Sequence, residues 1–448
     1  MTTDDLTRPG LGRTLFRMTW PMVFGVVSLL GFQLVDSAFI GQLGVDPLAA
    51  LGFTLPIQQL IIGFQVGLGI ATTAVIARTL GEGDPQRARR VGGLVVVAGA
   101  LTVAVLCLAL WLLRVPIVTL LGAEAEILPL IRRFWAPWLI SAWSGAVLYF
   151  GYSVMRAQGD TRTPGLWMAI TSAINLVLDP LYIFVFGWGL PGAAWATLTA
   201  FGLGIAFIYP ALIRWRMLHF NLLHVHPAPA LRQLASITGP AMVSQILPPV
   251  SAMLATALIA GYGAGAVAAW GLGTRLEFFS IVAVLALTMS LPPIIGRFLG
   301  AGEIHHIQRL VRIAVGFVLG WQLAIALLWL LLSGVLAELL TVDANVAATL
   351  QSYLMRVPLS YGPLGVCMLM VSVCNALGMP LRALVISLVR LFGCYLPLLW
   401  LGSLLLGLNG VFTGALLGNV AAGASAWLLY RQGLQHLEAT HQRQATSP

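Results

Sequence analysis

Residues 13–52 read RTLFRMTWPMVFGVVSLLGFQLVDSAFIGQLGVDPLAALG, and residues 232–271 read RQLASITGPAMVSQILPPVSAMLATALIAGYGAGAVAAWG. These two stretches open an internal repeat in which residues 13–84 align with residues 232–303 without a gap. Identical residues recur along the alignment. Among them are two prolines, Pro21 and Pro240, one near the start of each copy. The repeat predicts a chain built from two related halves.

The composition of the 448-residue chain indicates an integral membrane protein. Hydrophobic residues make up 59% and charged residues 9%, whereas soluble domains carry about 25% charged residues. The apolar runs are continuous and of helix length, without the alternation of a membrane barrel. We therefore predict an all-α fold with twelve membrane-spanning helices, at residues 16–40, 48–77, 91–113, 128–154, 164–186, 191–213, 235–260, 267–296, 310–333, 352–377, 382–406 and 410–430.

The repeat divides these spans into two pseudo-symmetric six-helix bundles. We assign residues 1–213 to the first bundle, 214–234 to a cytoplasmic linker, 235–430 to the second bundle and 431–448 to a cytoplasmic tail. Because six is even, both halves enter the membrane in the same orientation. Transporters whose halves rock around a central site have this arrangement, with an axis along the membrane normal.

The distribution of positive charge predicts the topology. All 24 basic residues are Arg, and with a cytoplasmic N-terminus 18 of them fall inside, 4 outside and 2 within spans. The positive-inside rule then places both termini in the cytoplasm, as in a multi-pass protein of the bacterial inner membrane. This topology accounts for the net charge of +9 without nucleic-acid binding. The lack of Lys excludes a Walker A loop for ATP.

Three acidic residues, Asp36, Asp179 and Glu277, lie inside apolar runs. Ionisable groups within the bilayer are costly and are functional candidates by default. Asn175 and Asp179 are four residues apart and share a helix face, and the following Pro180 leaves a helix carbonyl without its donor. These oxygens suit a proton relay or a small cation. The alternative is that Asp36 and Asp179 are acids near the outer membrane interface.

Other polar residues are candidates for contact with a transported molecule. Gln33 lies one turn before Asp36, and the repeat aligns Gln58 with Glu277, so that position is polar in both halves. For Glu277, a structural polar pair inside the second bundle is an equal alternative, and Arg390 is a candidate partner. Three residues of the first span, Pro21, Gly25 and Gly31, offer that helix places to bend, and Pro180 does so in the fifth span.

Four motifs together resemble the MATE family of multidrug and toxin extrusion transporters: VDSAFIGQLG, LGEGD, MRAQGDTRTP and INLVLDP. The acids of the first and fifth spans are similar to those of the DinF-like branch. The resemblance implies two bundles forming a V around a central chamber. It also implies that Asp36, Asn175, Asp179 and Thr197 converge within the first bundle, where the carboxyl pair would titrate as one coupled unit.

The sequence thus predicts a secondary active multidrug efflux antiporter that exports amphipathic or cationic compounds in exchange for protons. Spans 7 and 10 contain no acid, so coupling is expected in the first half only. Two alternatives are a Na⁺-coupled antiporter, with Na⁺ at the same four residues, and a lipid-linked precursor flippase. The chain has no nucleophile–base set or metal motif of an intramembrane enzyme. We expect no cofactor, no metal centre and no nucleic acid, with organic cations, drugs and the lipid bilayer as partners of a monomer.

Overall fold

The computed structural model describes residues 6–7, 10–120, 128–220 and 227–446, and these form helices joined by short turns. The first half contains α2 (Leu11–Gly41), α3 (Val45–Gly52), α4 (Leu55–Gly81), α5 (Pro85–Leu112), α6 (Arg114–Leu120), α7 (Leu128–Ala157), α8 (Arg162–Pro180), the π-helix η1 (Leu181–Val185) and α9 (Leu190–Arg214). The second half contains α10 (Pro227–Ala260), α11 (Ala264–Ser280), α12 (Val282–Gly300), α13 (Ile304–Leu340), α14 (Ala344–Leu354), the 3₁₀-helix η3 (Val357–Ser360), α15 (Tyr361–Ala376), α16 (Pro380–Leu388), the π-helix η4 (Val389–Tyr395) and α17 (Leu396–Thr446).

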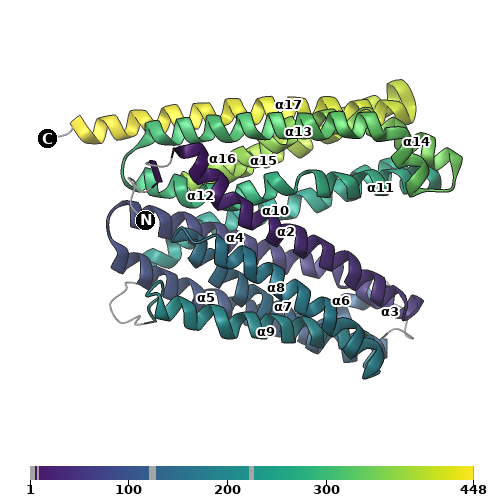
Figure 1. Cartoon of the computed structure of the whole chain (residues 1–448), viewed down its shortest axis with the longest axis horizontal. Coiled ribbons are helices and arrows are strands. Elements are labelled where there is room, and N and C mark those ends of the chain that lie inside the picture. The colour runs from purple at the N-terminus through teal and green to yellow at the C-terminus, as the bar shows by residue number, and fades with distance from the viewer. Residues whose placement is uncertain (1–5, 8–9, 121–127, 221–226, 447–448) are drawn as a thin grey trace.

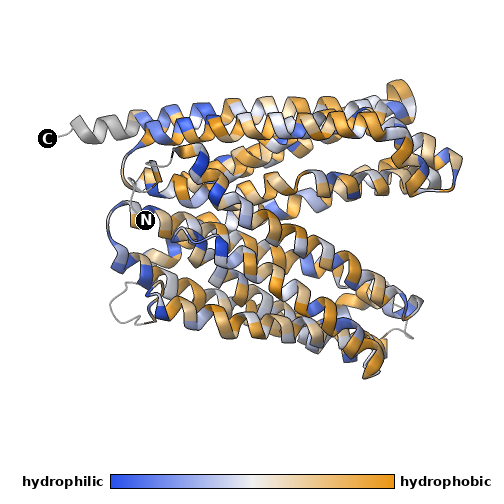
Figure 2. Cartoon of the chain, viewed as in Figure 1, coloured by the Kyte–Doolittle hydropathy of each residue, from blue (hydrophilic) through white to orange (hydrophobic). Residues whose placement is uncertain are grey.

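Twelve crossings can be traced through the described residues. Ten helical segments are long and apolar enough to span a bilayer. One of them, Pro380–Ala439, holds two crossings, because the backbone leaves the helical conformation at Gly407 (φ 61°, ψ −141°). The 30-residue helix α7 supplies the remaining crossing. Figure 2 shows that apolar residues dominate the middle of the helices while hydrophilic residues gather near their ends.

The two halves form two bundles, and the first helix of each half begins against the core of the other. Figure 1 shows the bundles meeting near the two termini and diverging toward α3 and α14. Leu15 and Met18 of α2 belong to the apolar core of the second half. Leu234 and Ile237, which the repeat aligns with them, belong to the core of the first half. The first residues of each repeat are therefore packed in the core of the other bundle, and this packing holds the two bundles together at this end.

Three helix pairs make most of the contact between the bundles, α4 with α10, α4 with α12 and α2 with α12. Hydrogen bonds cross the same seam. The hydroxyl groups of Thr19 and Ser290 lie 2.7 Å apart, and a guanidinium nitrogen of Arg297 donates to the carbonyl oxygen of Gln158 at 2.6 Å. All four residues are in the half of the molecule where the bundles meet (Figure 1).

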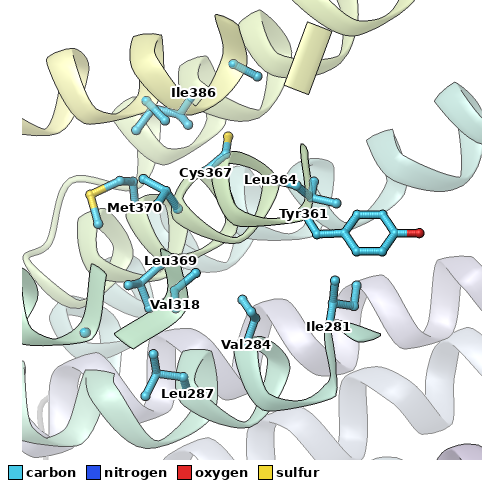
Figure 3. Close-up of a cluster of buried hydrophobic side chains, with 14 of the residues drawn as sticks. Ile281, Val284, Leu287, Val318, Tyr361, Leu364, Cys367, Leu369, Met370 and Ile386 are labelled. Atoms are coloured by element: carbon cyan, nitrogen blue, oxygen red, sulfur yellow. The ribbon is translucent and has the colours of Figure 1, made fainter. Parts of the chain in front are cut away.

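The core of the second half is filled by aliphatic side chains from α12, α13, α15 and α16. Figure 3 shows Leu287, Val318, Leu369 and Met370 turned toward one another between these helices. Each of them is at most 1% exposed. Close packing of this kind holds the helices of the second bundle together.

Several element boundaries differ from the hydropathy-based spans. The expected span 48–77 is interrupted by a turn at Phe53 and Thr54, and the span 267–296 by a turn at Ile281. Helix α17 continues to Thr446, through the segment expected as a tail. Helix α10 begins at Pro227, within the expected linker, and residues 221–226 of that linker lie outside the described residues. Hydropathy does not register a backbone break whose flanks are both apolar.

Candidate functional site

The site in the first half is built where α8 packs against α2 and α9. Helices α2 and α8 run in parallel, and the middle of α2 approaches the start of α8 closely. A Cβ atom added to Gly25 would lie 2.9 Å from the carbonyl oxygen of Gly165, and one added to Gly165 would overlap the carbonyl of Pro21. The two glycines thus allow backbone contact, which sets the distance between the helices farther along. Gly25 therefore has a packing role besides the bending role expected for it.

Asn175 connects α8 to α9 and orients the carboxyl group of Asp179. The amide orientation that satisfies both ends of Asn175 directs Nδ2 to the two carboxyl oxygens of Asp179, at 3.0 and 2.7 Å. Its Oδ1 then accepts from the backbone N–H of Thr197 at 3.1 Å and faces the Thr197 hydroxyl at 2.9 Å. Asn175 is 1% exposed and Asp179 is fully buried. The carboxyl group is therefore held in place by a neutral donor.

Asp36 of α2 completes the cluster. Its carboxyl group lies close enough to that of Asp179 for the two groups to interact electrostatically. In the part of the chain that the structure describes, no donor reaches the buried Oδ1 of Asp36. The structure thus brings Asp36, Asn175, Asp179 and Thr197 together.

The chain changes its helical geometry immediately after Asp179. Pro180 ends α8, and residues Leu181–Val185 continue as a π-helix. Single π-helical turns occur often at functional sites, where they free backbone groups and re-aim side chains. Phe184 of this turn packs edge-on against Phe39 of α2, with ring centroids 6.2 Å apart. The aromatic pair therefore joins the π-helical turn to α2.

Helix α2 itself is continuous from Leu11 to Gly41 and contains Pro21 within it. Gly31 has open space around the position where a Cβ would lie. Gln33, one turn before Asp36, is exposed. The expected bending positions of this helix are thus present within one unbroken element that carries Asp36 near its end.

Gln58 and Glu277, the other expected chamber residues, lie apart from the carboxyl pair. Gln58 is half-buried on α4 and Glu277 is half-buried on α11. The hydroxyl of Tyr353 on α14 donates to Oε2 of Glu277 at 3.3 Å. Arg390 of η4 is near enough for an attractive electrostatic interaction with Glu277. Glu277 therefore belongs to a separate polar group of the second half.

The tyrosines around Glu277 are the part of this group that the sequence analysis missed. Tyr361 and Tyr395 interact electrostatically with Glu277. Figure 3 shows the Tyr361 hydroxyl pointing away from the aliphatic core. Because these residues come from α11, α15 and η4, far apart in sequence, no local motif could have grouped them. Arg390 thus brings a positive charge near Glu277, whereas the cluster of the first half contains two acids.

The fold and the buried carboxyl pair together define a membrane transporter with two repeated bundles. The MatE family model matches residues 21–181 and 240–401, and the two matches begin at the prolines that the internal repeat aligns. The chain belongs to the MATE family. The expected all-α fold with twelve spans is confirmed, and the protein is a transporter and not an enzyme.

Relatives match nearly the whole chain. The FAD transporter of Shewanella oneidensis is 32% identical over 436 residues, covering 96% of each chain. The multidrug export protein MepA of Staphylococcus aureus is 22% identical and covers 93% of each. Among solved structures, the MATE transporter VcmN of Vibrio cholerae in its bent form is 56% identical with a TM-score of 0.93, covering 95% of this chain and 97% of that one. These matches agree on the family and the multi-pass membrane fold.

Proposed function

We propose that this protein exports amphipathic, often cationic, organic compounds in exchange for protons, with Asp36 and Asp179 as the coupling site. The supporting observation is that the two carboxyl groups lie close enough to interact, while Asn175, itself bonded to Thr197, holds the carboxyl group of Asp179. Two adjacent carboxyl groups titrate as a unit and share a proton. The assignment of this transporter to the DinF-like branch of the family is part of the proposal.

The proposed cycle follows from competition between a proton and a cation. A proton that enters from outside lowers the negative charge of the carboxyl pair, so the pair attracts a bound cation less strongly. Protonation also changes the contact of α2 with α8, which shifts the balance between two arrangements of the bundles. Each charge moved through 100 mV releases about 2.3 kcal/mol. Exchange of two protons for one monovalent cation moves one net charge and therefore supports roughly a fiftyfold substrate gradient.

The deciding experiment separates the two coupling ions. Inverted vesicles containing the protein receive a fluorescent organic cation and either a pH gradient alone or a sodium gradient alone. We expect the pH gradient to drive transport in the absence of sodium. Transport that requires sodium and ignores pH would establish Na⁺ at Asp36, Asn175, Asp179 and Thr197 instead.

FAD is a second candidate substrate, because a relative that covers 96% of the chain at 32% identity is named as an FAD transporter. The same vesicles test it when FAD replaces the dye. A flippase for lipid-linked precursors would need a cationic chamber for pyrophosphate, but Arg275 and Arg390 are the two Arg residues expected within spans. Uptake of FAD without any uptake of organic cations would reassign the substrate and leave the coupling site as proposed.

A further inference from the structure

A cavity of about 390 Å³ lies between the first turns of α13 and the last third of α17. This end of both helices is hydrophilic in Figure 2, whereas the adjoining turns are apolar. The cavity is therefore at the level where the helices leave the hydrocarbon core. Its lining comes from Gln308, Arg312, Trp427, Tyr430, Arg431, Leu434, Gln435 and Glu438.

The lining favours an anionic group. Arg312 and Arg431 both line the cavity and are exposed, and neither forms an ion pair with a carboxylate among the described residues. The acid of the cavity, Glu438, accepts a hydrogen bond from Gln308 instead. Two guanidinium groups thus face one carboxylate that already has a partner. Arginines of this kind are the usual ligands of phosphate.

The aromatic residues of the cavity fit the boundary between headgroups and acyl chains. The rings of Trp427 and Tyr430 are 5.5 Å apart. Trp and Tyr favour this boundary because one part of each side chain is apolar and another is polar. Tyr430 is near enough to Arg312 for an electrostatic interaction. The aromatic pair and the basic residue therefore line the same part of the cavity.

Beyond the cavity, the same helix faces continue as exposed apolar surface. On α13, Leu319 and Leu323 are 43% and 56% exposed, and they follow Arg312 at helical spacing. On α17, Val420 is 43% and Leu417 is 50% exposed, at helical spacing before Trp427 and Arg431. A soluble phosphate compound would use the basic cavity alone. A phospholipid would place its phosphate there and its acyl chains along both apolar faces.

We propose that this cavity binds an anionic phospholipid, with the phosphate between Arg312 and Arg431 and the glycerol backbone beside Trp427. Basic pockets between membrane helices bind such headgroups in other proteins. Because α13 and α17 both pack on α15, the lipid joins two peripheral helices of the second bundle. The site is independent of the carboxyl pair and does not require any particular transported substrate.

Native mass spectrometry of the full-length protein in mild detergent tests the site. We compare retention of dioleoyl-phosphatidylglycerol with that of dioleoyl-phosphatidylcholine, which has the same acyl chains. Wild-type protein should retain the anionic lipid about tenfold better or more, given the usual strength of two arginines near a lipid surface. The double variant Arg312→Gln/Arg431→Gln should lose this preference. Arg309→Gln, an exposed arginine on the same helix outside the lining, should keep it.

Equal retention of the anionic lipid by wild type and the double variant would overturn the proposal. So would displacement of the lipid by millimolar inorganic phosphate alone, since that would make the cavity a site for soluble phosphate. A second measurement on wild-type protein covers the case in which the double variant does not fold. A photoactivatable phosphatidylglycerol should crosslink to the segments 308–312 and 427–438, and crosslinks confined to other helices would contradict the assignment.

Discussion

Gly81 of α4 and Gly300 of α12 each lie against the backbone of the other helix. A Cβ atom on Gly81 would overlap the carbonyl of Arg297, and one on Gly300 would overlap the carbonyl of Arg78. The repeat aligns Gly81 with Gly300 and Arg78 with Arg297, so the contact is reciprocal. The pseudo-twofold axis between the bundles passes through this point, and no side chain larger than hydrogen fits at either position.

Replacing either glycine should therefore disturb the closed end of the molecule. Gly81→Ala and Gly300→Ala each push α4 and α12 apart, at a cost of about 1–3 kcal/mol typical of overpacking. We expect dye efflux from vesicles to fall about tenfold in both variants, because a change of that size moves a two-state equilibrium substantially. Gly202→Ala on α9 is the control, since its Cβ would meet open space. Efflux within twofold of wild type in both seam variants would contradict this role.

The polar group of the second half should not be needed for coupling. Glu277 has Tyr353 as a hydrogen-bond donor and Arg390 as a nearby positive charge, so it has no second acid with which to share a proton. Glu277→Gln should keep efflux driven by a pH gradient, with a changed preference among substrates. The measurement is initial efflux of several dyes in parallel. If Glu277→Gln abolished coupling as completely as Asp36→Asn, coupling would not be confined to the first bundle.

Substitution of Asn175 should reduce efflux more than substitution of the Thr197 hydroxyl. Asn175→Ala removes both hydrogen bonds to the buried Asp179 carboxyl, and hydrogen bonds to charged groups contribute about 1.5–3 kcal/mol each. Efflux should fall by about tenfold or more. Thr197→Val removes the hydroxyl but keeps the backbone N–H that donates to Asn175, so its effect should remain within about threefold. Equal losses in the two variants, measured at matched expression, would show that the hydroxyl is itself a ligand.

Sequence patterns were sufficient to predict the overall architecture, because hydropathy and the internal repeat can both be read directly from the order of residues along the chain. The same is true of the motif INLVLDP, whose spacing puts Asn175 and Asp179 on one face. The contact between Asp36 and Asp179 joins helices 143 residues apart in the chain, and only the family resemblance indicated it. The breaks at Thr54 and Ile281 were missed, since an apolar run reads the same whether its backbone is continuous or not.

The group around Glu277 was also beyond local reasoning. Glu277 and Tyr353 are 76 residues apart, and the π-helical turn that carries Arg390 has no strong sequence signal. An acid inside an apolar run can be recognised from the sequence, because burying it in the membrane is energetically unfavourable. The hydrogen-bond donors that offset this free energy come from whichever helices pack nearby, and the sequence does not show which these are. Packing therefore decides whether an intramembrane acid stands beside a second acid, as Asp36 does, or beside a cation, as Glu277 does.

Asp36→Asn is the most direct test of the coupling site. Asn is nearly isosteric with Asp and removes a costly intramembrane acid, so the protein should fold and insert. Export driven by a gradient should be abolished, because an amide does not exchange a proton. Asp179→Asn should do the same, and the double variant should be little worse than either single one, since the two residues act as one unit.

Binding measurements then separate coupling from folding. As the pH falls, the wild-type carboxyl pair gains its proton and loses negative charge, so the wild-type protein should bind a cationic dye more weakly. Asp36→Asn lacks one of the two carboxyl groups that share the proton. It should therefore lose most of this pH dependence while still binding the dye. Fluorescence titrations of dye against purified protein across a series of pH values give the comparison. The same pH dependence in wild type and Asp36→Asn would refute competition at this pair, even if the variant no longer exported the dye.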